Sequence, residues 1–139
     1  MNEFEKCLNE RKIVKMNASK EVIYKEFENA MYDLARSKES LTKGDFKWAS
    51  IQAYYSMFHC IKALIFKKGY REKSHYCLLV AFKELYVKTG EMDKEFADNF
   101  EICMDIRQEA DYGLSYKDEN AKIAVEDAEK LIKATESIL

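Results

Sequence analysis

The chain has 139 residues, the length of one domain, and 47% of them are hydrophobic, which is ordinary for a globular protein. Its 23 basic and 25 acidic residues leave a net charge of −2, which excludes a general electrostatic attraction to nucleic acid. Proline is absent and only four glycines occur, so the composition favours a fold that is mostly α-helical.

The N-terminal part of the chain predicts two helices. Residues 2–15 are interpreted as a short helix, and either Asn17 or Ser19 can cap the helix that follows it. Apolar residues recur at helical spacing along one face of this second helix, which ends near Gly44.

The third predicted helix spans residues 46–67, with Asp45 as its cap. Its apolar residues cover such a wide arc that we expect it to be central or to lie at a subunit interface. Tyr54 falls on one apolar stripe and is interpreted as core packing. A separate stripe mixes ring and polar groups and is the part most suited to contact a ligand, a partner or a second copy of the chain: Gln52, Tyr55, His59, Lys62 and Phe66.

Further helices follow. Ser74 can cap the next one, and Gly90 and Gly113 mark later breaks between apolar patterns of helical period. The short turns favour antiparallel neighbours. We therefore predict a single all-α domain over residues 1–139, an up-down antiparallel bundle of five or six helices in which residues 1–18 form an accessory N-terminal helix.

Four cysteines lie in apolar stretches and none belongs to a CxxC pair: Cys7, Cys60, Cys77 and Cys103. We expect them to be the reduced, buried thiols of a cytoplasmic protein. His59 and His75 lie close to cysteines in sequence, but residues one or two apart on a helix point in different directions, so we expect no metal site and no cofactor. No apolar run approaches 20 residues and no signal peptide is recognisable, so we expect neither membrane insertion nor secretion.

Arg107 is the sharpest candidate for a functional residue. It extends an apolar stripe of Phe96, Phe100 and Cys103, so its side chain is expected to face protein. A guanidinium cannot lose its charge, and its burial therefore demands an acceptor. Asp111, one turn later, can supply that acceptor in an ion pair, which is the commoner arrangement in helical bundles; in the other interpretation, Arg107 is held to bind a phosphate group.

Three segments, in this order, resemble the HEPN domain family: 48–59, 68–75 and 107–113. The resemblance spans most of the chain and implies a small all-helical protein that forms a homodimer. Many members are similar to metal-independent ribonucleases, whose signature is an arginine, four to six variable residues and a histidine. In those members the resemblance implies that the histidine assists the RNA 2′-hydroxyl or its leaving group, that the arginine holds the phosphate, and that two motifs meet in a cleft between subunits.

Arg107 matches the arginine of that signature, but Tyr112 stands where the histidine would be, and no histidine follows His75. A tyrosine, with a pKa of about 10, is a poor general base at neutral pH. The resemblance therefore implies a non-catalytic protein that binds a minimal nucleotidyltransferase in a toxin–antitoxin-type pair. The residues expected to line its binding cleft are Arg107, Asp111, Tyr112, Tyr55 and His59.

Two other functions stay open. In one, the chain is a ribonuclease toxin with a degenerate motif, in which Arg107 acts with Tyr112, His59 or His75. In the other, it is a nucleotide-binding module whose phosphate contacts come from Arg107 and the basic tract 67–73. RNA is the ligand expected of the first, and a nucleotide that of the second.

Overall fold

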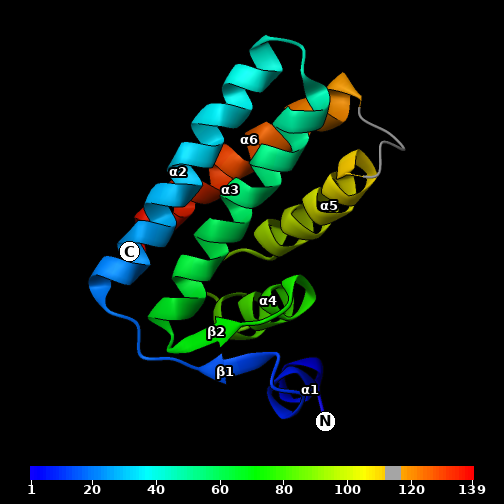
Figure 1. Ribbon diagram of the computed structural model, residues 1–139. Coiled ribbons are helices and arrows are strands. Elements are labelled where there is room, and N and C mark those ends of the chain that lie inside the picture. The colour runs from blue at the N-terminus through cyan, green and yellow to red at the C-terminus, as the bar shows by residue number, and fades with distance from the viewer. Residues whose placement is uncertain (112–116) are drawn as a thin grey trace.

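The computed structural model describes residues 1–111 and 117–139, with the side chain of Asp111 outside the description. Within these residues the chain forms six α-helices, one π-helical segment and a two-stranded sheet, so the predicted all-α bundle is confirmed (Figure 1). The elements in chain order are α1 (Glu3–Asn9), β1 (Ile13–Lys15), α2 (Lys20–Thr42), α3 (Phe46–Lys67), β2 (Tyr70–Glu72), α4 (His75–Phe82), η1 (Lys83–Val87), α5 (Lys94–Asp111) and α6 (Asp118–Glu136).

Three helices begin at side-chain caps that the sequence predicts. Ser19, Asp45 and Ser74 each accept a hydrogen bond from a backbone N–H in the first turn of α2, α3 and α4, respectively. These bonds satisfy amide groups that have no partner within the helix. Ser19, not Asn17, is the cap of α2, and α3 spans residues 46–67 as predicted.

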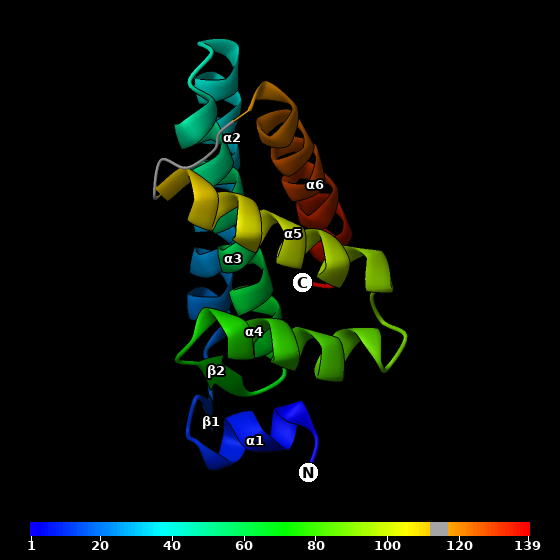
Figure 2. The same cartoon turned by 90° about the vertical axis from the view of Figure 1, so that its right-hand side faces the viewer.

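Helix α3 is the centre of the bundle. Fourteen of its 22 residues are buried, and it contacts α2, α4, α5, α6 and β2. Figure 1 shows α2 and α3 side by side as a long antiparallel pair, with α6 behind them and α5 at one flank. Figure 2 shows α5 crossing α3 obliquely, and α4 lying across the end of α3 that is nearest to α1. A helix with so wide an apolar arc is covered on several sides, which explains its central place.

The N-terminal segment differs from the single helix predicted over residues 2–15. Helix α1 ends at Asn9, and β1 pairs antiparallel with β2, with Ile13 opposite Glu72. Ile13 is 1% exposed, so the strand buries this apolar side chain. A helix continued through residue 13 would have placed the side chain in a different direction. The pairing is a tertiary contact between segments far apart in sequence, which local periodicity does not encode.

The prediction of four reduced cysteines is wrong for two of them. Cys7 of α1 and Cys77 of α4 form a disulfide, with 5.9 Å between their Cα atoms, and both residues are buried. This Cα separation lies within the normal range for a disulfide. Cys60 and Cys103 are free and buried as predicted, and burial raises the pKa of each thiol to about 12.

Candidate functional site

Arg107 lies on the inward face of α5 and reaches the central helix. Phe100 and Cys103, which precede it on the same face, are fully buried. The carbon at the centre of the Arg107 guanidinium is 5.0 Å from the ring centroid of Tyr54 and 5.9 Å from that of Tyr55. Both distances are within the range of a cation–π contact. The side chain is half-buried, so the aromatic rings hold a permanent positive charge near the protein surface.

Tyr54 links α5 to α4 through the core. Its ring is fully buried and stacks on Phe100, with 5.4 Å between centroids and 5° between planes. Its hydroxyl lies 2.6 Å from Nδ1 of His75. Burial raises the pKa of Tyr54, although the positive charge of Arg107 opposes this rise. The hydroxyl therefore keeps its proton at neutral pH.

His75 is the first residue of α4, directly after the Ser74 cap. Its ring stacks on Phe58 at 4.5 Å and is half-buried. Burial lowers the pKa of His75, and the charges of Arg107 and Lys62 lower it further. The imidazole is accordingly neutral at pH 7. Arg107, Tyr54 and His75, from three different helices, form what we call the Arg107–Tyr54–His75 cluster.

His59, whose ring also lies near that of Phe58, belongs to a second polar group. Its Nδ1 lies 2.7 Å from Glu26 of α2, and its Nε2 lies 3.7 Å from Asp33. Lys62 is 3.8 Å from Glu26 and 3.8 Å from Glu72, which ties α2 and β2 to α3. Burial acts to raise the pKa of Glu26, but the hydrogen bond from His59 and the nearby cations outweigh it and lower the pKa. This network holds helices together through paired charges.

The structure brings together only some of the residues predicted to line a binding cleft. Arg107 and Tyr55 are in contact, whereas His59 pairs with α2 instead. The side chain of Asp111 and all of Tyr112 lie outside the described residues. The roles of all five residues stay predictions.

Two of the four basic residues in the tract 67–73 have partners within the chain. Lys67 donates a hydrogen bond to the backbone carbonyl of Ile138. Lys68 pairs with Glu91 at 2.6 Å. These partners reduce the charge that the tract offers to a phosphate group.

Residues 24–139 match the family model of the HEPN domain. The chain belongs to the HEPN domain family. The match begins within α2, so α1 and β1 precede the region that this HEPN domain shares with the family model.

Relatives of this HEPN protein come from archaea and bacteria. The "Putative toxin MJ0142" of Methanocaldococcus jannaschii is 32% identical over 121 residues, which cover 87% of this chain and 78% of that protein. A "UPF0332 protein" of Thermotoga maritima is 32% identical over 88 residues, which cover 62% of this chain and 67% of that protein. The crystal structure of TT1696 from Thermus thermophilus aligns with a TM-score of 0.71 at 18% identity, covering 84% of this chain and 98% of that one, and so shows the same fold.

Sequence reasoning missed the part that Tyr54 and His75 play in this HEPN domain. The interpretation of Tyr54 as core packing is confirmed by its burial but omits its hydroxyl. One signal is present in the sequence: a buried tyrosine hydroxyl needs a hydrogen-bond partner. The identity of that partner depends on how α4 packs against α3. This packing brings together Tyr54 and His75, which are 21 residues apart in sequence, and no local pattern reveals it.

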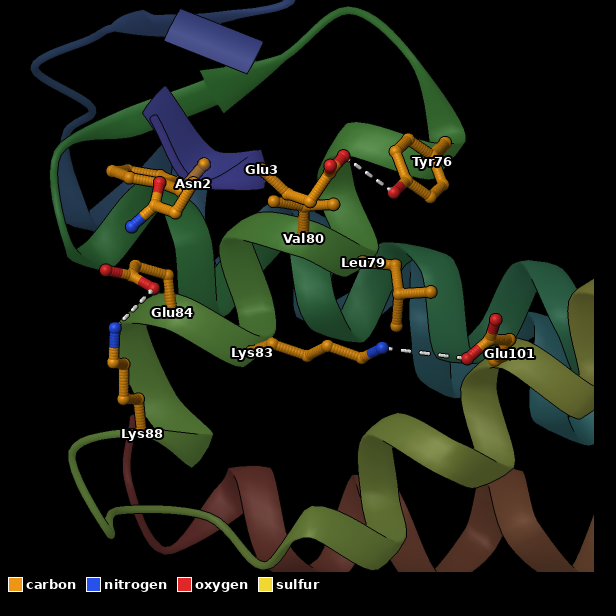
Figure 3. A pocket seen from close by; sticks show the side chains of 10 residues that line it. Asn2, Glu3, Tyr76, Leu79, Val80, Lys83, Glu84, Lys88 and Glu101 are labelled. Carbon is orange, nitrogen blue, oxygen red and sulfur yellow. Dashed lines mark hydrogen bonds and ion pairs between the residues drawn. The ribbon is translucent and has the colours of Figure 1, made fainter. Parts of the chain in front are cut away.

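A cavity of about 320 Å³ lies between α1, α4, η1 and α5 (Figure 3), and no member of the Arg107–Tyr54–His75 cluster lines it. Ion pairs cross its lining: Lys83 lies 3.6 Å from Glu101, and Lys88 lies 3.4 Å from Glu84. Because these opposite charges are already paired, the cavity offers little that would select a charged ligand.

Residues 1–111 and 117–139 of the HEPN protein lack two further kinds of feature, a metal site and a membrane-spanning helix. No group of three or more His, Cys, Asp or Glu side chains there is placed to hold a metal ion. In the same residues, no helix combines the length and the apolar character needed to cross a bilayer.

Proposed function

We propose that this HEPN protein acts by binding, as one member of a toxin–antitoxin-type pair whose other member is a minimal nucleotidyltransferase. The observation that carries the proposal is the half-exposed Arg107, held over Tyr54 and Tyr55 on the inward face of α5. Family membership supports it, and so does the name of the archaeal relative as a toxin. In this proposal two copies of the chain form a homodimer, and Arg107, Asp111 and Tyr112 line the cleft that receives the partner.

A guanidinium stacked on aromatic rings is suited to this task. Stacking uses its faces, while the N–H groups at its edge fit the two oxygens of a carboxylate or phosphate. Because the rings of Tyr54 and Tyr55 restrict its motion, less side-chain entropy is lost when an anionic group binds. Arg107 is therefore the residue whose loss should weaken binding most.

The proposal that this protein does not cleave RNA rests on the chemistry of the motif. The position that holds a histidine in ribonucleases of this family type is Tyr112, whose hydroxyl is a weak base at neutral pH. A HEPN domain that keeps the arginine without this imidazole can still bind a phosphate or carboxylate group. It lacks the histidine that would transfer the proton in the ribonuclease signature.

Binding to the partner tests the proposal. A minimal nucleotidyltransferase is co-expressed with tagged wild-type protein, Arg107→Ala and Arg36→Ala. Arg36 is a matched control, because its guanidinium also lies over a tyrosine ring, Tyr32 at 5.3 Å, and pairs with Glu39 on the exposed surface of α2. We expect co-purification with the wild type and Arg36→Ala but not with Arg107→Ala. Equal recovery with all three would refute the role of Arg107.

A second candidate, a ribonuclease toxin, is favoured by the position of His75. Its imidazole is neutral at pH 7 and joins Arg107 through Tyr54, so a base and a phosphate-binding cation belong to one cluster. This function predicts growth arrest on expression of the wild type, relieved equally by Arg107→Ala and His75→Ala. Harmless expression of the wild type would exclude it.

A further inference from the structure

Hydrogen-bond donors and acceptors in the Arg107–Tyr54–His75 cluster can be assigned without reference to any ligand. The hydroxyl of the fully buried Tyr54 lies 2.6 Å from Nδ1 of His75, and the Arg107 guanidinium lies over the Tyr54 ring. Arginine offers only donors, so Arg107 cannot accept the proton of the Tyr54 hydroxyl. The hydroxyl keeps this proton because burial raises the pKa of Tyr54, and His75 Nδ1 is the acceptor available to it.

This order of donation determines the tautomer of His75. An Nδ1 that accepts from Tyr54 carries no proton, so the neutral ring carries its proton on Nε2. Within residues 1–111 and 117–139, Nε2 has no hydrogen-bond partner, and the His75 side chain is half-exposed. The contacts thus run from Arg107, over the Tyr54 ring, to the Tyr54 hydroxyl and His75, and they leave an N–H donor at Nε2.

We propose that Tyr54 is a positioning residue that fixes His75 as an Nε2–H donor, so that Arg107 and His75 together form a two-donor site for an oxyanion of the phosphate class. The identity of the ligand rests on the function proposed above, whereas the assignment of the tautomer does not. Two donors on separate helices, α5 and α4, define a direction of approach that a single arginine cannot.

The surroundings of His75 keep it neutral. From α3, Tyr54 and Tyr55 contribute polar rings and Lys62 a positive charge, while α5 contributes Arg107. A protonated His75 would add a third positive charge to this region and would also need an acceptor at Nδ1, where the Tyr54 hydroxyl donates. The neutral Nε2–H form avoids both.

Nitrogen NMR of the two imidazoles tests the tautomer directly. His59 and His75 are the only histidines, so the His59→Gln variant identifies the signals of His75. At pH 7.5 we expect His75 Nδ1 to be unprotonated and Nε2 to carry the proton. A protonated Nδ1 would overturn the proposal, because the ring would then donate to Tyr54. This measurement needs no ligand or partner, so its failure is distinct from a failure of the proposed function.

The Tyr54→Phe variant tests whether the hydroxyl is the cause. It keeps the ring that stacks on Phe100 and removes only the O–H group. Because that group stabilises the neutral imidazole, we expect the pKa of His75 to rise. Tyr86→Phe is the matched control, since Tyr86 is also fully buried and its hydroxyl donates to the Leu64 carbonyl at 2.6 Å. An unchanged His75 pKa in Tyr54→Phe would refute the positioning role.

Inorganic phosphate tests the two-donor site. We expect the Nε2–H signal of His75 to shift on addition of phosphate in the wild type and in Tyr86→Phe. The shift should be lost in Arg107→Gln, which removes the other donor. A His75 signal that does not respond to phosphate in the wild type would overturn the site.

Discussion

The disulfide between α1 and α4 makes a quantitative prediction about stability. Cys7 and Cys77 are 70 residues apart in sequence, so the bond closes a large loop in the unfolded chain. The chain-entropy relation for a loop of this length gives a loss of about 4 kcal/mol in the free energy of unfolding when the bond is removed. For a domain of this size, such a loss lowers the melting temperature by roughly 10–15 °C.

Urea unfolding of the wild type, Cys7→Ala and Cys103→Ala, each with and without dithiothreitol, measures this effect. Cys103 is a matched control because it is also buried but is a free thiol. We expect reductant to destabilise the wild type and Cys103→Ala by about 4 kcal/mol and to leave Cys7→Ala unchanged. Thiol titration of the denatured wild type should find two free thiols before reduction and four after it, because Cys60 and Cys103 are free and two cysteines are bonded. Four thiols before reduction, or a wild type indifferent to reductant, would refute the reasoning.

Two further predictions concern the packing of Phe100 against Tyr54 and the dependence of stability on pH. Phe100→Ala removes the ring on which Tyr54 stacks and should lower the free energy of unfolding by about 3–5 kcal/mol in urea titrations. A loss below about 1 kcal/mol would contradict the packing described. The pKa of His75 is lower in the folded protein than its ordinary value of about 6.5, so between these two values the unfolded chain binds more protons than the folded one. The stability contributed by the neutral ring is therefore present above about pH 6.5 and is lost as the pH falls through the pKa of the folded state. Urea titrations at pH 7.5 and 5.5 should therefore show a smaller loss of stability on acidification in His75→Gln than in the wild type, and equal losses would contradict it.

Local features of the fold were predictable from the sequence because neighbouring residues determine them. The apolar pattern of α3 and the caps Ser19, Asp45 and Ser74 depend on residues within a turn or two of each other. The inward face of α5 was also predictable, and it placed Arg107 against protein, as the ring contacts with Tyr54 confirm.

Contacts between distant segments were not predictable in the same way. The pairing of β1 with β2 and the bond between Cys7 and Cys77 each join the N-terminal segment to residues 70–77. The meeting of Tyr54 with His75 depends likewise on how α4 crosses the end of α3. Arg107 is recognisable from the sequence as a candidate because a charged residue lies on an apolar stripe. Tyr54, on a similar stripe, cannot be distinguished from a packing residue until the partner of its hydroxyl is known.

The central claim, that this HEPN domain binds through Arg107 without cleaving RNA, is tested most directly by incubating the purified protein with a long single-stranded RNA. Wild type, Arg107→Ala and Arg36→Ala are compared on a denaturing gel at pH 7.5. The account predicts intact RNA in all three reactions. RNA fragments produced by the wild type and Arg36→Ala, but not by Arg107→Ala, would contradict it.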